Sequence, residues 1–130
     1  MELARLRSQL DDPRQASAWL GPWGVADPQF AHGRLVELAT GGWTLDLLAA
    51  VCAQLAEHLP GTADPDMALH NLSRFVTAAR SPLALGALFE RDPEALPILL
   101  QIFSSSQYLS DVLIRDPESY DLLRITEAQP

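Results

Sequence analysis

Two acidic residues and two glycines are the part of this chain that comes nearest to a metal-dependent transfer site. Asp64 and Asp66 flank Pro65, and Gly41-Gly42 lies upstream of them. Paired carboxylates can hold magnesium for nucleotidyl transfer when a rigid strand presents both of them to the same ions. Here a proline separates the acids, a helical pattern follows at once, and the glycines lie too far upstream for one hairpin. We therefore expect a helix cap at Asp64 rather than a metal site.

The other reactive side chains lack the neighbours that catalysis or metal binding requires. His32, His58 and His70 have no His, Cys or acidic partner at metal-ligand spacing, so we expect them at surface or boundary positions. The run 104–106 is Ser-Ser-Ser without a nucleophile elbow, and it is predicted to end one helix and cap the next. Cys52, the only cysteine, lies on an apolar stripe and is expected to be buried and inert. The sequence thus predicts no catalytic, cofactor-binding or metal-binding residue in this chain.

The three tryptophans admit two interpretations. Trp19, Trp23 and Trp43 could form an exposed aromatic patch that docks another domain or protein. They could equally fill the core and anchor loops against it. All three lie near glycine-rich turns, and this position favours the core.

The charge balance excludes several classes of partner. Nine basic residues, all of them arginines, stand against 17 acidic residues, and the net charge is −8. Polyanions are repelled and no basic stripe offsets this, so we expect neither a nucleic acid nor an anionic membrane as partner. The absence of lysine also excludes a Walker-type phosphate loop. No apolar run approaches the roughly 20 residues of a bilayer span. With a single cysteine the chain is compatible with a reducing compartment, and we expect a soluble cytoplasmic protein.

A repeated dipeptide marks the predicted helix starts. An acidic or hydroxyl side chain precedes a proline at six places, where it can accept a hydrogen bond from a backbone N–H of the first turn. Proline is suited to the first helical position because no N–H is needed there. The six pairs are Asp12-Pro13, Asp27-Pro28, Asp64-Pro65, Ser81-Pro82, Asp92-Pro93 and Asp116-Pro117.

Apolar residues recur at helical spacing after these starts and predict which face of each helix is buried. The stripe that begins at Thr44 is the widest, so the helix that follows is predicted to be central. After Asp64, the apolar stripe leaves Asn71 on the rest of the helix circumference. Pro97 follows Pro93 closely, which leaves open whether that helix starts late or bends.

These signals together predict the fold class. No stretch shows the period-two alternation of a half-buried strand. Turn residues separate the stripes at positions 21–24, 41–42 and 60–61. We therefore expect an all-α protein, a compact antiparallel bundle of about six to seven helices that forms a single domain over residues 1–130.

Two segments of the second half have a distinctive order and spacing. Residues 64–75 read D-P-D-M-A-L-H-N-L-S-R-F, and residues 99–118 end in the spacing S-x-x-L-x-x-x-L-x-x-x-P-E. Both resemble segments near the start of the glutamine synthetase adenylyltransferases. The resemblance covers roughly residues 64–124, and residues 1–63 match more loosely as a helical preamble.

The resemblance implies a function for the longer protein. In that family, one nucleotidyltransferase half removes AMP from a tyrosine of glutamine synthetase by phosphorolysis. The other half attaches AMP from ATP with magnesium, and glutamine and the PII signalling protein set the balance. This chain would be the N-terminal helical module that supports the deadenylylating half. Implied partners are glutamine synthetase, PII and the downstream nucleotidyltransferase domain. Magnesium and ATP are implied only for the parent enzyme.

No catalytic residue carries over, because the catalytic glycine-serine loop and carboxylate pair of the family are missing here. The matched residues Arg74, Phe75, Tyr108 and Leu109 are instead expected to be packing or cap-network positions. The alternative hypothesis is a free-standing acidic helical domain that binds other proteins.

Overall fold

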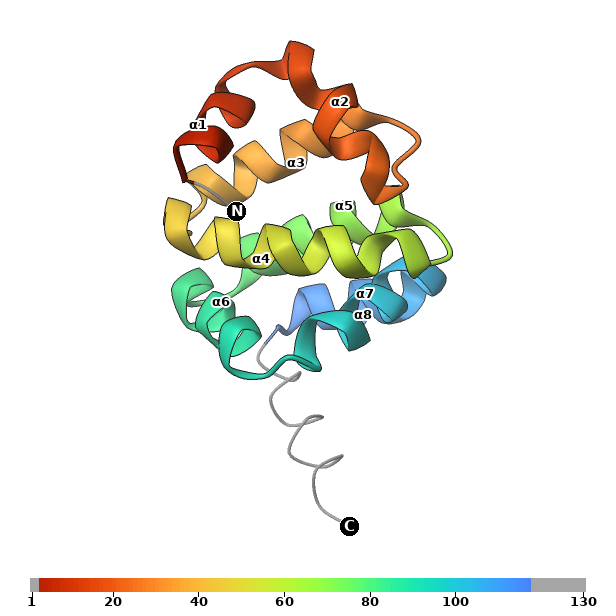
Figure 1. Cartoon of the computed structure of the whole chain (residues 1–130). Coiled ribbons are helices and arrows are strands. Elements are labelled where there is room, and N and C mark those ends of the chain that lie inside the picture. Colours follow the sequence, from red (N-terminus) through yellow and green to blue (C-terminus); the bar gives the residue numbers. More distant parts are fainter. Residues whose placement is uncertain (1–2, 118–130) are drawn as a thin grey trace.

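The chain folds into a bundle of helices, as its sequence predicts (Figure 1). The computed structural model describes residues 3–117, and this part contains eight α-helices, three short 3-10 helices and no strand. The α-helices are α1 (Leu3–Asp11), α2 (Ala16–Leu20), α3 (Pro28–Thr40), α4 (Leu45–His58), α5 (Pro65–Ala78), α6 (Pro82–Arg91), α7 (Ala95–Ser105) and α8 (Gln107–Arg115). The 3-10 helices are η1 (Pro13–Gln15), η2 (Gly21–Trp23) and η3 (Leu59–Gly61). The all-α expectation is confirmed, with slightly more helices than expected.

Three of the predicted cap-and-proline starts begin α-helices. The side chains of Asp27, Asp64 and Ser81 each accept a hydrogen bond from the backbone N–H three residues later, at the start of α3, α5 and α6 respectively. Asp12 begins the 3-10 helix η1 instead, and α2 follows directly. The sixth pair begins at Asp116, and a helix after it would lie outside the described residues.

The structure decides the question that Pro97 left open after Asp92-Pro93, because the helix there starts late. The Asp92 carboxylate accepts from the N–H of Glu94 at 3.0 Å and caps a turn, and α7 begins only at Ala95. A later start places Pro97 at the third helical position, where the backbone N–H has no partner within the helix. A helix beginning at Pro93 would put Pro97 in its interior, where its missing N–H would cost a hydrogen bond.

Two long helices, α4 and α5, cross the middle of the molecule (Figure 1). The helices α1 to α3 lie on one side of them and α6 to α8 on the other. Helix α5 packs mainly against α3, α7 and α8, whereas α4 packs against α1 and α6. One hydrophobic cluster runs from Leu6 to Leu113, so the described residues before and after position 64 share a core. The predicted central position of α4 is confirmed, because this helix crosses the middle of the molecule and buries six residues.

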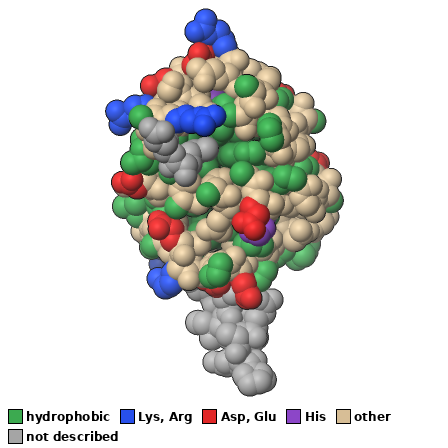
Figure 2. Space-filling view, in the orientation of Figure 1, with side chains coloured by type: hydrophobic (Ala, Val, Ile, Leu, Met, Phe, Trp, Pro, Cys, Tyr) green, Lys and Arg blue, Asp and Glu red, His purple; other side chains and the backbone are tan. Residues whose placement is uncertain are grey.

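The distribution of arginines on the surface agrees with the prediction that no basic stripe is present. On the face drawn in Figure 2, arginine side chains are scattered and do not merge into one continuous basic surface. None of the helices between residues 3 and 117 is both long and apolar enough to span a lipid bilayer.

Candidate interaction site

The two carboxylates that resembled a magnesium pair serve instead to hold helix ends. Asp64 accepts from the N–H of Met67 at 3.1 Å, as a cap does. Asp66 accepts from the N–H groups of Ala26 and Asp27 at 2.6 and 2.9 Å, so it anchors the loop that leads into α3. The cap interpretation of Asp64 is confirmed, and the longer-range role of Asp66 was not predicted. Within residues 3–117, no three His, Cys, Asp or Glu side chains are grouped to hold a metal ion.

The histidines lie in three different environments. His32 is buried, with its Nε2 atom 3.1 Å from the carbonyl oxygen of Gln9. Its expected surface or boundary position is therefore wrong, because α1 packs over this part of α3 in a way that local spacing does not reveal. His58 is half-buried beside Glu57, at 3.9 Å. His70 is half-buried, and its ring lies against Phe30 with the ring centroids 5.4 Å apart.

The serine run and the cysteine are structural, as expected. Helix α7 ends at Ser105, and the Ser106 hydroxyl caps α8 by accepting from the N–H of Leu109 at 3.1 Å. Cys52 is fully enclosed in the core, and this burial raises the pKa of its thiol to about 12. A thiol with such a pKa stays protonated near neutral pH and is a poor nucleophile.

The tryptophans belong to the core rather than to an exposed patch. Trp23 and Trp43 are buried, and Trp43 donates its indole N–H to the carbonyl of Pro82 at 2.7 Å. Trp19 is half-buried and packs edge-on against Trp23, with the ring centroids 5.5 Å apart. The interpretation that these residues anchor loops against the bundle is confirmed.

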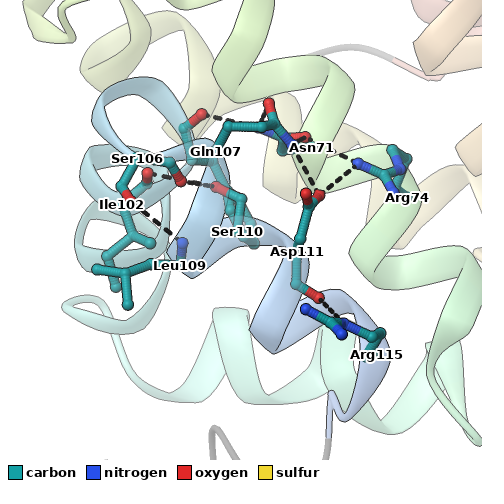
Figure 3. A network of polar contacts seen from close by, with 10 residues as sticks. Asn71, Arg74, Ile102, Ser106, Gln107, Leu109, Ser110, Asp111 and Arg115 are labelled. Carbon is teal, nitrogen blue, oxygen red and sulfur yellow. Dashed lines mark hydrogen bonds and ion pairs between the residues drawn. The ribbon is translucent and has the colours of Figure 1, made fainter.

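A network of polar side chains joins α5 to α7 and α8 (Figure 3). Asn71, fully buried, donates to the carbonyl of Phe103 at 2.9 Å and exchanges longer hydrogen bonds with the amide of Gln107. Arg74 forms an ion pair with Asp111 at 3.0 Å, and Gln107 donates to the same carboxylate at 2.8 Å. Together these contacts lower the pKa of Asp111, the hydrogen bonds from Gln107 and Arg74 being the main causes.

The network corrects one expectation and supports another. Asn71 was expected outside the apolar stripe of its helix, yet it is buried because α7 and α8 cover that side of α5. Arg74 occupies the expected network position, and Phe75 lies in the core. The i,i+3 spacing of Asn71 and Arg74 and the i,i+4 spacing of Gln107 and Asp111 place each pair on one helix face. The sequence does not show that the two faces meet.

Beside this network, the outer face of α8 exposes an apolar ridge. Tyr108 is 74% exposed, Leu109 49% and Val112 39%. These three residues lie within one turn of the helix and form what we call the α8 ridge. The side chains of Tyr108 and Leu109 therefore do not pack into the core, where α8 buries only Ser110 and Leu113. The backbone N–H of Leu109 does belong to the cap of α8, as the second of the expected roles has it. An exposed cluster of this kind next to a rigid network is typical of a contact surface for another protein or domain.

Comparison with known proteins adds no assignment. The sequence matches no family model, and neither a curated protein nor a solved structure matches it.

Proposed function

We propose that this chain is the non-catalytic N-terminal helical module of a bifunctional glutamine synthetase adenylyltransferase, acting in nitrogen regulation. The observation that carries the proposal is the contact between the two family-like segments. Residues 64–75 lie on α5 and residues 99–118 on α7 and α8, and these helices pack together directly. The polar residues that the motifs contain bond to one another across this contact, as Asn71 does with Gln107 and Arg74 with Asp111. Two separated motifs that form one packed unit are expected of a module retained as a whole.

The role of the module in the parent is to support the deadenylylating half. The α8 ridge lies on the last described helix, close in sequence to Pro117, and the chain continues after Pro117. A domain that follows in the same polypeptide is held near this ridge at high effective concentration. The downstream nucleotidyltransferase domain is therefore the proposed occupant of the ridge. Glutamine synthetase, PII, ATP and magnesium are proposed ligands of the parent enzyme rather than of this module.

The first test is the reading frame that encodes the chain. The proposal requires a glycine-serine loop followed by a carboxylate pair on a predicted strand downstream of residue 130. A stop codon or an unrelated sequence at that place would contradict it.

The second test uses the parent enzyme with a triple substitution, Tyr108→Ser, Leu109→Ser and Val112→Ser. We expect phosphorolytic removal of AMP from adenylylated glutamine synthetase to fall about tenfold or more, since hot-spot apolar contacts contribute roughly 2 kcal/mol each. Leu83→Ser is the matched control, because Leu83 is 51% exposed but lies on α6. Equal activity of the triple variant and this control would remove the α8 ridge from the proposal.

The alternative is a free-standing acidic domain that binds other proteins, favoured by the net charge of −8. Calorimetric titration of the 130-residue chain with glutamine synthetase and with PII separates the two hypotheses. Heat of binding with either protein favours the free-standing domain, whereas no heat is expected of a module that only supports the deadenylylating half. The non-catalytic role has its own test. When the isolated chain is incubated with adenylylated glutamine synthetase, phosphate and magnesium, we expect no release of AMP. Activity proportional to its concentration would contradict a non-catalytic role.

A further inference from the structure

Few apolar contacts hold helix α8 to the bundle. Of its nine residues only Ser110 and Leu113 are buried, and Ile114 is half-buried against the core. The two helices on which α8 packs, α5 and α7, bury seven and six residues. Because the packing of a buried apolar face supplies most of the stability of a helix in a protein, α8 receives less of this stabilisation than its two neighbours.

Polar side chains add contacts between α8 and α5 (Figure 3). Asp111 of α8 forms an ion pair with Arg74 of α5 at 3.0 Å, and Gln107 exchanges hydrogen bonds of 3.3 and 3.4 Å with Asn71. Gln107 also donates to Asp111 at 2.8 Å, which links the two pairs. We call these four residues the α8 clasp. The side chains of Arg74 and Asp111 are 42% and 41% exposed, so water and salt compete with their ion pair.

The contact between α5 and α7 does not depend on α8. Asn71 donates its shorter hydrogen bond, at 2.9 Å, to the carbonyl of Phe103 on α7, and this bond can persist when α8 moves away. Helix α7 ends at Ser105 and α8 begins at Gln107, so the extended residue Ser106 is a joint at which the two helices can separate. A helix with little buried apolar surface at such a joint has the features of a local unfolding unit.

We propose that α8 opens as a unit of its own while the rest of the bundle stays folded, and that the α8 clasp sets how often it opens. Opening dismantles the α8 ridge, because all three ridge residues lie on this helix. A partner that binds the ridge therefore holds α8 closed, by thermodynamic linkage. This consequence rests on the proposed function, in which the downstream domain is that partner, whereas the opening itself does not.

Native-state hydrogen exchange of the full chain, followed by NMR, measures the opening. We expect the backbone N–H groups of residues 111–115 in α8 to be protected at least about tenfold less than those of residues 51–55 in the central helix α4. Exchange in α8 should change little with low concentrations of urea, because a local opening exposes little surface, whereas exchange in α4 should rise steeply. Equal protection of the two helices, or an equal dependence on urea, would overturn the proposal.

Substitutions in the same experiment test the α8 clasp. Asp111→Asn should raise exchange in α8 about threefold and leave exchange in α4 unchanged. Glu90→Gln, at an exposed position of α6, is the matched control and should not alter exchange in α8. Asp111→Asn and this control giving the same exchange in α8 would overturn the role of the clasp.

A double variant separates the ion pair from the favourable position of a negative charge near the start of α8. Arg74→Gln alone should raise exchange in α8, and adding it to Asp111→Asn should raise exchange no further, because the pair is already lost. Additive effects of the two substitutions would overturn the role of the ion pair. Both measurements use the 130-residue chain without the parent enzyme, so their failure is distinct from a failure of the proposed function.

Discussion

At the scale of single residues, Asn71 is a buried amide that ties three helices together. Its side-chain nitrogen donates to Phe103 at the end of α7 and to Gln107 at the start of α8. Its oxygen accepts from Gln107 and, at 3.5 Å, from Arg74. All of its polar capacity is thus used inside the protein, which is the condition for burying an amide without a net penalty.

We predict that Asn71→Leu lowers the free energy of unfolding by about 1–3 kcal/mol, because the carbonyl of the buried Phe103 loses its partner and the Gln107 amide loses one as well. The measurement is urea denaturation followed by circular dichroism. Gln101→Leu, at an exposed position of the adjoining α7, is the control and should change stability by less than about 0.5 kcal/mol. Equal effects of the two substitutions would show that the network adds no stability.

His70 gives the fold a dependence on pH. Burial is the main cause that lowers its pKa below 6.5, and the charges of Arg34 and Arg74 add to the effect, while Glu37 opposes it. The unfolded chain therefore takes up a proton more readily than the folded one, and stability falls as the pH drops through about 6.5. We predict that His70→Phe, which keeps a ring against Phe30, makes unfolding less dependent on pH between about pH 8 and pH 5.5. Unchanged pH dependence in urea titrations of this variant would contradict the assignment.

At the scale of elements, capping chemistry sets where the helices start. The size of the side chains at a contact sets how closely two helices can pack. Asp27, Asp64 and Ser81 are recognisable from the sequence because each precedes a proline and needs only local backbone groups. The late start of α7 needed one further fact, the position of Pro97, and that fact was also in the sequence. The contact of α4 with α6 is different, since it depends on a glycine whose neighbour lies 39 residues away in the chain.

That glycine is Gly86, where α6 meets α4. A Cβ atom added there would lie 2.3 Å from Leu47 Cδ2 and 3.0 Å from the indole nitrogen of Trp43. We predict that Gly86→Ala destabilises the protein by about 1–3 kcal/mol through overpacking. Gly33→Ala in α3 is the matched control, because no atom outside the backbone of its own helix and its chain neighbours lies within 4 Å of its added Cβ. This control should stabilise by about 0.5–1 kcal/mol through helix propensity. Thermal unfolding measures both, and a stable Gly86→Ala would mean that α6 can move outward freely.

At the scale of the whole molecule, the core is continuous and encloses the single thiol. Cys52 has no exposed surface, and burial raises its pKa to about 12. We predict that alkylation by iodoacetamide occurs only through unfolding, so that its rate rises with urea in step with the unfolded fraction. Fast labelling under native conditions would instead reveal local opening of α4. The same inertness makes cysteines engineered elsewhere selectively labelled.

The all-α class, three of the α-helix starts with their caps, the central position of α4 and the buried thiol could all be predicted from the sequence. These features depend on groups within a few residues of one another, namely a cap and its N–H donors or a stripe of apolar residues on one helix. The burial of Asn71 and His32, the hydrogen bonds that the loop before α3 donates to Asp66, and the exposure of Tyr108 and Leu109 could not be predicted. Each of these depends on which helix faces which, and that choice is made by packing between segments tens of residues apart, where no local pattern records it.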